Sequence, residues 1–258
     1  MTLFSAEHLK ISFGGLMAVD DFSLHLKEGD LLGLIGPNGA GKTTVFNMIT
    51  GTLKPTQGKI FFQGKEITGL KPNGITQKGI ARTFQNIRLF QDLPVIENVM
   101  ISYHGRLRSS FISAVLGTPL YLREEREMCE GSMGLLHRVQ LAGLANERAG
   151  ALSYGQQRRL EIARALATHP KLLLLDEPAA GMNPQETQEL MEFILKIKKD
   201  FNLTILLIEH DMRVVMGICQ RIKVLDYGAT LAEGTPREIQ NNPKVIAAYL
   251  GEGGENIA

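Results

Sequence analysis

One short stretch near the N-terminus constrains the fold of this chain more than any other. It reads GPNGAGKTT, from Gly36 to Thr44, and it matches the pattern G-x-x-x-x-G-K-[ST]. The apolar run LLGLI, of strand length, precedes it, and the helix-like VFNMIT follows. A strand, a glycine-rich turn and a helix in this order predict a parallel α/β sheet with a phosphate-binding loop at the carboxyl end of one strand.

The residues of this loop predict the binding of a nucleotide. Gly39 and Gly41 allow the backbone to turn its N–H groups toward phosphates. We expect Lys42 to reach the β- and γ-phosphates and the Thr43 hydroxyl to hold Mg²⁺. A glycine-rich turn without a ligand is the alternative, and the match of the whole pattern and of both flanks disfavours it. The complete predicted ATP-binding loop is Gly36, Pro37, Asn38, Gly39, Ala40, Gly41, Lys42, Thr43 and Thr44.

A second motif, KLLLLDEP, predicts the metal ligand and the catalytic base. Its four consecutive leucines are typical of a strand that is buried on both faces of a parallel sheet. Asp176 stands at the carboxyl end of this strand, where a carboxylate can bind Mg²⁺. Alternation along the strand directs Glu177 elsewhere, as a general base that orients water requires. Taken alone, Asp176 could be a strand-end cap and Glu177 a surface charge.

A third motif, LSYGQQRRLEIARAL, indicates a second anion-binding site. Ser153 and Gly155 offer a hydroxyl and backbone N–H groups at the start of a predicted helix. Leu160, Ala163 and Ala167 recur at three- to four-residue intervals and give this helix an apolar face. Other faces of the helix carry charged residues, among them Arg158, Arg159 and Glu161.

These motifs, in this order and followed by a histidine after TILLIE, resemble those of the ATP-binding subunits of ABC transporters. The closer resemblance is to the branched-chain (high-affinity) amino-acid import ATPases, and it covers essentially the whole chain. The phrases that carry it are RTFQNIRLF, LSYGQQRRLEIARALA, LDEPAAGMNP, LIEHDM and EGTPREIQNNPKVIAAYLG. Two positions depart from the family's commoner pattern: Tyr154 replaces a glycine, and Asn183 replaces an aspartate.

The resemblance implies roles for residues whose local sequence does not by itself indicate a function. Gln85 resembles the residue that contacts Mg²⁺ and senses the transmembrane partner, and His210 resembles the histidine that touches the γ-phosphate and water. Phe13 resembles the aromatic that stacks on adenine. In isolation these three are more simply a polar loop residue, a strand-end histidine and a core aromatic. The signature loop, which acts on the ATP of the opposite subunit, is Ser153, Tyr154, Gly155 and Gln156.

The implied function is ATP hydrolysis that energises the import of branched-chain amino acids. The implied partners are a second ATP-binding subunit, identical or paralogous, two transmembrane permease subunits and, indirectly, a solute-binding protein. Such a chain lies at the cytoplasmic face of the cell membrane and uses Mg²⁺, with ATP as substrate. The alternatives are a related ATPase for another cargo, such as urea or lipid, and a non-transport ABC ATPase.

Charge and composition exclude other classes. The 28 basic and 27 acidic residues leave a formal net charge of +1, with no basic tail or stripe, so we expect no nucleic-acid partner. No apolar run approaches the ~18–20 residues that cross a bilayer, and the N-terminus does not resemble a signal peptide. Cys129 and Cys219 match no metal or disulfide spacing, which favours unpaired thiols in a reducing compartment.

The expected architecture is an α/β P-loop NTPase fold of the ABC type. It has a parallel or mixed sheet core, an N-terminal antiparallel β region and an inserted helical subdomain. Residues 1–258 form one nucleotide-binding domain, with residues 1–85 and 155–233 in the core, 86–154 in the helical subdomain and 234–258 in a tail.

The segment between the core and the helical subdomain, from Asn86 to Ser102, allows two interpretations. One is a hydrophobic cleft that receives a cytoplasmic helix of the membrane subunit. The other is a local core. The apolar residues concerned are Leu89, Phe90, Leu93, Val95 and Ile96.

Overall fold

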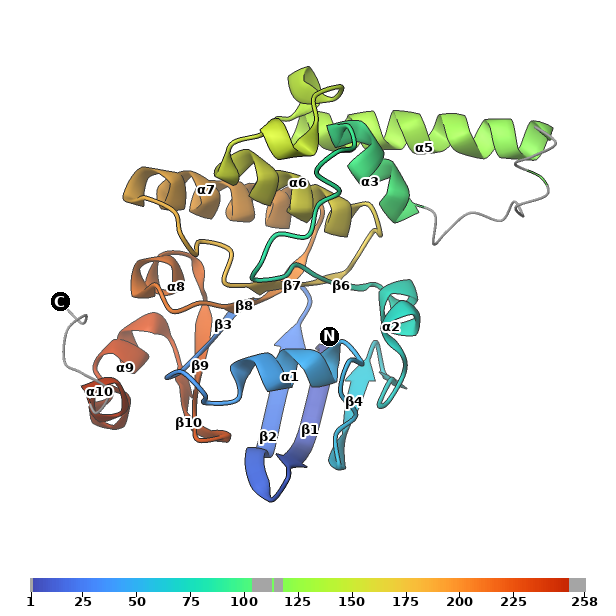
Figure 1. Ribbon diagram of the computed structural model, residues 1–258. Helices are drawn as coiled ribbons and strands as arrows, with labels where there is room; N and C mark the ends of the chain where they lie inside the picture. Colours follow the sequence, from blue (N-terminus) through green and yellow to red (C-terminus); the bar gives the residue numbers. More distant parts are fainter. Residues whose placement is uncertain (1, 104–112, 114–117, 251–258) are drawn as a thin grey trace. The chain divides into compact units, whose positions relative to one another are not determined.

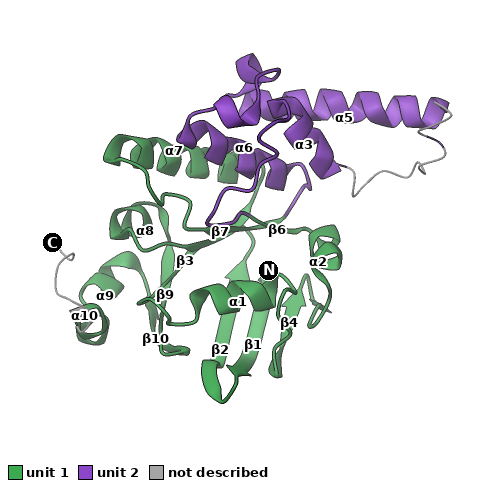
Figure 2. Ribbon diagram, viewed as in Figure 1, with its two compact units in different colours: residues 1–82, 171–258 green, residues 83–170 purple. Residues whose placement is uncertain are grey.

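The computed structural model describes residues 2–103, 113 and 118–250, and the chain forms two compact units (Figure 2). The first, here called the sheet unit, comprises residues 1–82 and 171–258; the second, the helical unit, comprises residues 83–170. The sequence placed these boundaries at 86 and 154. They differ because the signature helix packs on the other helices of the helical unit rather than standing with the core.

The sheet unit is built around a six-stranded mixed sheet, whose strand order is β10-β9-β3-β8-β7-β6. Five strands run parallel to their neighbours, and β10 pairs antiparallel with β9. Every residue of β3, β7 and β8 is buried, as their apolar sequences predicted. The strands are β3 (Leu31–Ile35), β6 (Ile80–Arg82), β7 (Leu172–Asp176), β8 (Thr204–Ile208), β9 (Arg221–Asp226) and β10 (Ala229–Gly234).

A four-stranded antiparallel sheet forms the rest of the β structure in the sheet unit, in the order β2-β1-β4-β5. Its first two strands form a long hairpin (Figure 1). The predicted antiparallel region is therefore confirmed. The strands are β1 (Thr2–Phe13), β2 (Leu16–Lys27), β4 (Gln57–Phe62) and β5 (Lys65–Glu66).

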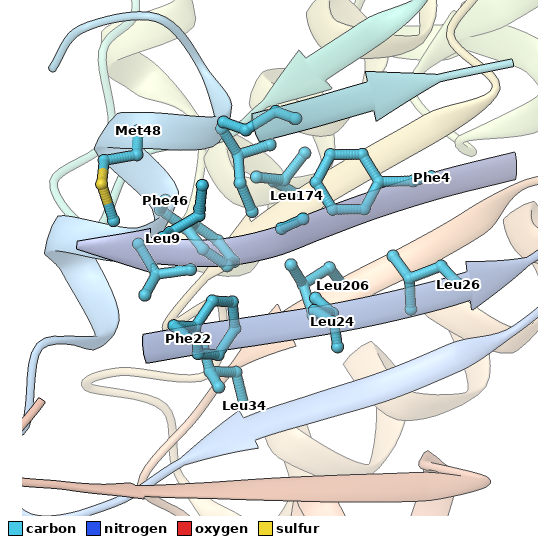
Figure 3. Packing of buried hydrophobic residues seen from close by; sticks show 14 of the residues in the cluster. Phe4, Leu9, Phe22, Leu24, Leu26, Leu34, Phe46, Met48, Leu174 and Leu206 are labelled. Carbon is cyan, nitrogen blue, oxygen red and sulfur yellow. The ribbon is translucent and has the colours of Figure 1, made fainter. Parts of the chain in front are cut away.

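The main hydrophobic core of the sheet unit lies between these two sheets and the first helix. Figure 3 shows β1 and β2 side chains packed beside residues of the mixed sheet and of α1 (Lys42–Ile49). Phe46 and Met48 anchor α1 in this core. Because α1 begins directly after the glycine loop, its burial fixes the position of that loop. The labelled residues are Phe4, Leu9, Phe22, Leu24, Leu26, Leu34, Phe46, Met48, Leu174 and Leu206.

The remaining helices of the sheet unit begin where the sequence provides proline or a capping side chain. Pro72, Pro184 and Pro236 occupy first-turn positions, where no intrahelical N–H is lost. Pro243 begins the last helix of the described residues and separates it from the one before. These helices are α2 (Pro72–Lys78), α7 (Pro184–Asp200), α8 (Met212–Ile218), α9 (Pro236–Gln240) and α10 (Pro243–Leu250).

The described residues of the helical unit form α3 (Val95–Tyr103), α5 (Pro119–Arg138), two short 3-10 turns (Ala142–Leu144 and Ala149–Ala151) and α6 (Tyr154–Leu166). In α5, Met128, Leu135 and Leu136 are buried among exposed charges, which agrees with the helical subdomain that the sequence predicted. Both α3 and α5 pack against α6 (Figure 1). Within the described part of the chain, no helix is both long and apolar enough to span a membrane.

Candidate active site

The glycine loop of the sheet unit has the conformation that a phosphate cradle needs. Gly36 and Gly41 have φ values of 148° and 98°, which disfavour residues with a side chain. A Cβ at Gly36 would lie 2.0 Å from the carbonyl oxygen of Leu225, and one at Gly41 would lie 2.6 Å from that of Ala18. Both glycines are therefore required by close backbone approach as well as by φ.

Lys42 lies at the centre of this loop. Its side chain is buried, and its Nζ donates hydrogen bonds to the carbonyl oxygens of Gly36 (2.7 Å) and Pro37 (2.8 Å). The ammonium group is thus held within the turn of the loop, while Thr43 is exposed beside it at the start of α1. A cation and a hydroxyl at a helix N-terminus form an anion-binding arrangement.

Asp176 ends β7, as predicted, and it is buried. Arg82, the last residue of β6, donates to its Oδ2 at 2.6 Å and to Asn47 Oδ1 at 2.7 Å. The guanidinium also lies over the Phe46 ring, 5.5 Å from its centroid. Arg82 therefore orients the Asp176 carboxylate and balances its charge, a role that the sequence did not reveal.

Glu177 and His210 are brought together by neighbouring parallel strands. Glu177 follows β7 with φ 46°, and His210 lies just beyond β8; His210 Nδ1 is 3.6 Å from Glu177 Oε2. The Glu177 amide donates to the carbonyl of Ile208, which extends the sheet pairing by one step. The sequence expected strand alternation to separate Glu177 from Asp176. The left-handed backbone at Glu177 replaces simple alternation, because β7 has already ended.

Glu209 directly precedes His210, and the sequence did not predict a role for it. Its carboxylate is fully buried; Oε1 accepts the Ala179 N–H (2.8 Å), and Oε2 accepts the N–H groups of His210 (3.0 Å) and Asp211 (3.3 Å). Burial raises the pKa of Glu209, although these backbone hydrogen bonds oppose the shift. A charged residue directly after four consecutive buried apolar residues was the available signal.

Phe13 stands at the tip of the β1–β2 hairpin, where it pairs with Leu16 across a Gly14–Gly15 turn. Its side chain is 46% exposed, so it is not a core aromatic. An exposed aromatic ring can stack on a flat base.

The signature loop lies in the helical unit, at the N-terminus of α6. Ser153 is the N-cap, and it forms a capping box with Gln156: its Oγ accepts the Gln156 N–H at 3.4 Å, and Gln156 Oε1 accepts the Ser153 N–H at 3.0 Å. The helix therefore begins at Tyr154, and the last three of the four signature residues lie in its first turn. Tyr154 is 40% exposed.

Arg158 joins the signature helix to residues 84–85, here called the Gln85 segment. Its side chain is fully buried rather than exposed to solvent. It donates to the carbonyl oxygens of Phe84 (2.8 Å) and Gln85 (3.0 Å) and to the Tyr154 hydroxyl (3.1 Å). Glu161 completes the set: it accepts from Arg158 at 2.7 Å and from the Phe84 N–H at 3.1 Å. Gln85 itself is exposed.

The structure thus gathers two groups of predicted residues. In the sheet unit it places the glycine loop, Asp176, Glu177 and His210 at the carboxyl ends of neighbouring strands. In the helical unit it joins the Gln85 segment to the signature helix through Arg158.

Comparisons with known proteins agree with this geometry. The ABC transporter family profile matches residues 19–180, and that of the branched-chain amino acid ATP-binding cassette transporter matches residues 229–255. The chain is 50% identical over 244 residues to the high-affinity branched-chain amino acid transport ATP-binding protein BraF of Pseudomonas aeruginosa, covering 95% of this chain and 96% of BraF.

Solved structures show the same architecture. The ADP conformation of MJ1267, an ATP-binding cassette of an ABC transporter, matches with a TM-score of 0.86 and 33% identity over 97% of this chain and 99% of MJ1267. The ATP-binding cassette MJ0796, solved as a dimer in a post-hydrolysis state bound to ADP and Pi, matches with a TM-score of 0.74 and 26% identity, covering 91% and 99% of the two chains.

Proposed function

The chain belongs to the ABC transporter family of ATP-binding cassettes, and we propose that it hydrolyses ATP to energise the import of branched-chain amino acids. The near full-length match with BraF is the observation that supports branched-chain amino acids as the cargo. The short Glu177–His210 separation beside the glycine loop supports the hydrolytic chemistry. The other features of the proposal follow from where each side chain lies.

ATP binding is assigned to the glycine loop and the β1–β2 hairpin. Lys42 exchanges its hydrogen bonds with the loop carbonyls for the β- and γ-phosphates, and the loop amides surround the same oxygens. The exposed ring of Phe13 stacks on the adenine. Binding is therefore separate from the groups that act on water.

The residues present fit a Mg²⁺ ion that keeps several waters. Mg²⁺ binds proteins through one or two carboxylates together with substrate phosphates. Asp176, at a strand end, and the Thr43 hydroxyl provide such a donor set in the sheet unit. The family resemblance also implies Gln85 as a Mg²⁺ contact. When bound, the ion neutralises the charge that develops on the phosphates.

Hydrolysis is assigned to Glu177 and His210. The Glu177 carboxylate accepts a proton from water and aligns that water with the γ-phosphate. His210 lies 3.6 Å from this carboxylate, and the resemblance assigns it to the γ-phosphate and the same water. Catalysis of this reaction rests mainly on positioning and electrostatic stabilisation. The loops that carry the two side chains must therefore hold them in a fixed position.

The signature loop is assigned to the ATP of a second cassette, identical or paralogous. The N-terminus of α6 offers backbone N–H groups and the Ser153 cap to an anion. Tyr154 adds a phenol at this surface. The dimeric state of the similar cassette MJ0796 supports such an arrangement.

We assign the membrane contact to the Gln85 segment and its neighbour Phe90. Phe90 is 47% exposed, whereas Val95 is fully buried, so the two interpretations of this segment each describe part of it. One of the two permease subunits would dock here through a cytoplasmic helix, at the cytoplasmic face of the membrane, and the permeases would receive cargo from a solute-binding protein. A Phe90→Glu variant should then lose transport, measured as amino-acid uptake, while the isolated subunit still binds ATP. Normal uptake by this variant would refute the docking site.

Uptake into vesicles tests the proposal directly. The complete transporter, assembled with its permeases and binding protein, should take up labelled leucine, isoleucine and valine only with ATP inside. Lys42→Ala in this chain should abolish that uptake by weakening ATP binding. Uptake of urea or a lipid instead would show that the proposed cargo is wrong. ATPase activity without uptake of any cargo would favour a non-transport ATPase.

A further inference from the structure

The loops that carry Glu177 and His210 share one buried carboxylate, that of Glu209. Glu177 lies after β7 and His210 after β8, and these two parallel strands are paired up to Asp176 and Ile208. Beyond this point the sheet no longer fixes the backbone, except through the bond from the Glu177 amide to Ile208. The relative position of the two side chains therefore depends on contacts between the loops.

Glu209 supplies those contacts from both of its oxygens. Oε1 accepts the N–H of Ala179 in the loop after β7, and Oε2 accepts the N–H groups of His210 and Asp211 in the loop after β8. The Ala180 amide in turn donates to the carbonyl oxygen of Glu177. This hydrogen bond connects Glu177 to the rest of the loop after β7. One carboxylate thus spans both loops.

We propose that Glu209 is a positioning residue for hydrolysis, which sets the separation of Glu177 and His210 through the backbone of both loops. It acts through these two residues, because its hydrogen bonds go to Ala179, His210 and Asp211, and none within the described residues joins it to Lys42 or to the loop that binds phosphate. The inference rests on the proposed roles of Glu177 and His210 and adds the group that aligns them.

The chemistry of the side chain indicates which substitutions to use. A glutamine at this position keeps one carbonyl oxygen, but its NH₂ group faces backbone N–H donors and leaves one loop without an acceptor. An alanine removes both acceptors. The loss of alignment should therefore be graded, with Glu209→Gln between the wild type and Glu209→Ala.

Steady-state ATP hydrolysis by the full-length chain in the assembled transporter is the first measurement. We expect kcat to fall about 10- to 100-fold in Glu209→Gln and further in Glu209→Ala, while KM and the ATP dissociation constant stay within about twofold. Glu233→Gln is the matched control, because Glu233 pairs with Lys223 and Arg221 on β9 and β10 and its substitution removes the same charge. Its kcat should equal that of the wild type.

A spectroscopic measurement separates alignment from a loss of stability. The chain contains six histidines, so ¹⁵N-histidine labelling gives a simple amide spectrum, in which His210→Gln identifies the His210 signal. In Glu209→Gln the His210 amide signal should move and the others should stay.

Two results would overturn the proposal: a kcat of Glu209→Gln within twofold of the wild type, or a fall in kcat matched by an equal loss of ATP affinity. Glu177→Gln, measured in parallel, distinguishes this failure from that of the proposed function. If Glu177→Gln hydrolyses ATP normally, the assignment of the base is wrong. If it is inactive while Glu209→Gln is normal, only the positioning role is wrong.

Discussion

The sheet unit and the helical unit each contain a fully buried charged side chain that ties separate backbone segments together, but the charges have opposite signs. In the sheet unit the Glu209 carboxylate accepts three backbone N–H groups. In the helical unit the Arg158 guanidinium donates to two backbone carbonyls, a carboxylate and a hydroxyl. Each of these two side chains holds together backbone segments that are not paired with one another in a sheet.

The difference lies in how each charge is compensated. Arg158 meets an opposite charge, Glu161, whose pKa is nevertheless raised by burial. Glu209 is compensated mainly by backbone dipoles, and the nearest ion-pair partner given by the structure is the largely exposed His210 ring at 3.9 Å. A carboxylate held by backbone N–H groups fixes loop geometry, whereas a paired guanidinium joins elements. We therefore expect Glu209 to matter more for turnover and Arg158 more for stability.

The largest effect on stability should come from Arg158→Met. This change leaves Glu161 as an uncompensated buried carboxylate, and breaking such a pair costs about 3–5 kcal/mol. Urea unfolding of the full-length chain, followed by circular dichroism, measures the loss. Arg159→Met is the matched control, since Arg159 is the adjacent residue and bonds the exposed Gln140 side chain. Equal midpoints for the two variants would contradict the ranking.

Substitution of the N-cap residues of α7 and α6 should lower the stability by smaller and unequal amounts. Asn183 Oδ1 accepts the N–H groups of Gln185 and Glu186, both at 3.0 Å, whereas Ser153 Oγ accepts one at 3.4 Å. Asn183→Ala should cost about 1 kcal/mol and Ser153→Ala less, within the range of ~0.5–2 kcal/mol for caps. Thermal unfolding checks the order.

The same two variants should reverse their order in ATP hydrolysis. Ser153 belongs to the loop assigned to the partner's ATP, so Ser153→Ala should lower turnover more than Asn183→Ala. If Asn183→Ala were instead the less active variant, the assignment of Ser153 would lose its main support.

The motif residues were predictable because they obey local rules. The strand, turn and helix around Lys42, the buried strand that ends at Asp176 and the capped helix at Ser153 each follow from neighbouring residues. The antiparallel region and the mixed sheet were also confirmed.

The roles of Arg82 and Arg158 were not predictable, because their partners lie far away in the sequence. Arg82 meets Asp176, 94 residues later, and Arg158 meets the Phe84 carbonyl, 74 residues earlier. Helical periodicity places Arg158 off the apolar face of α6 and says nothing of what covers it. The boundary of the helical unit was displaced for the same reason, since α6 takes its partners from α3 and α5.

The most direct test of the account is ATP binding and turnover by Glu177→Gln. Because the glycine loop binds ATP independently of the Glu177 carboxylate, we predict an ATP dissociation constant within about twofold of the wild type. Loss of the general base should lower turnover at least ~100-fold, and the variant should persist as an ATP-bound dimer in light scattering. Hydrolysis at the wild-type rate would contradict the account.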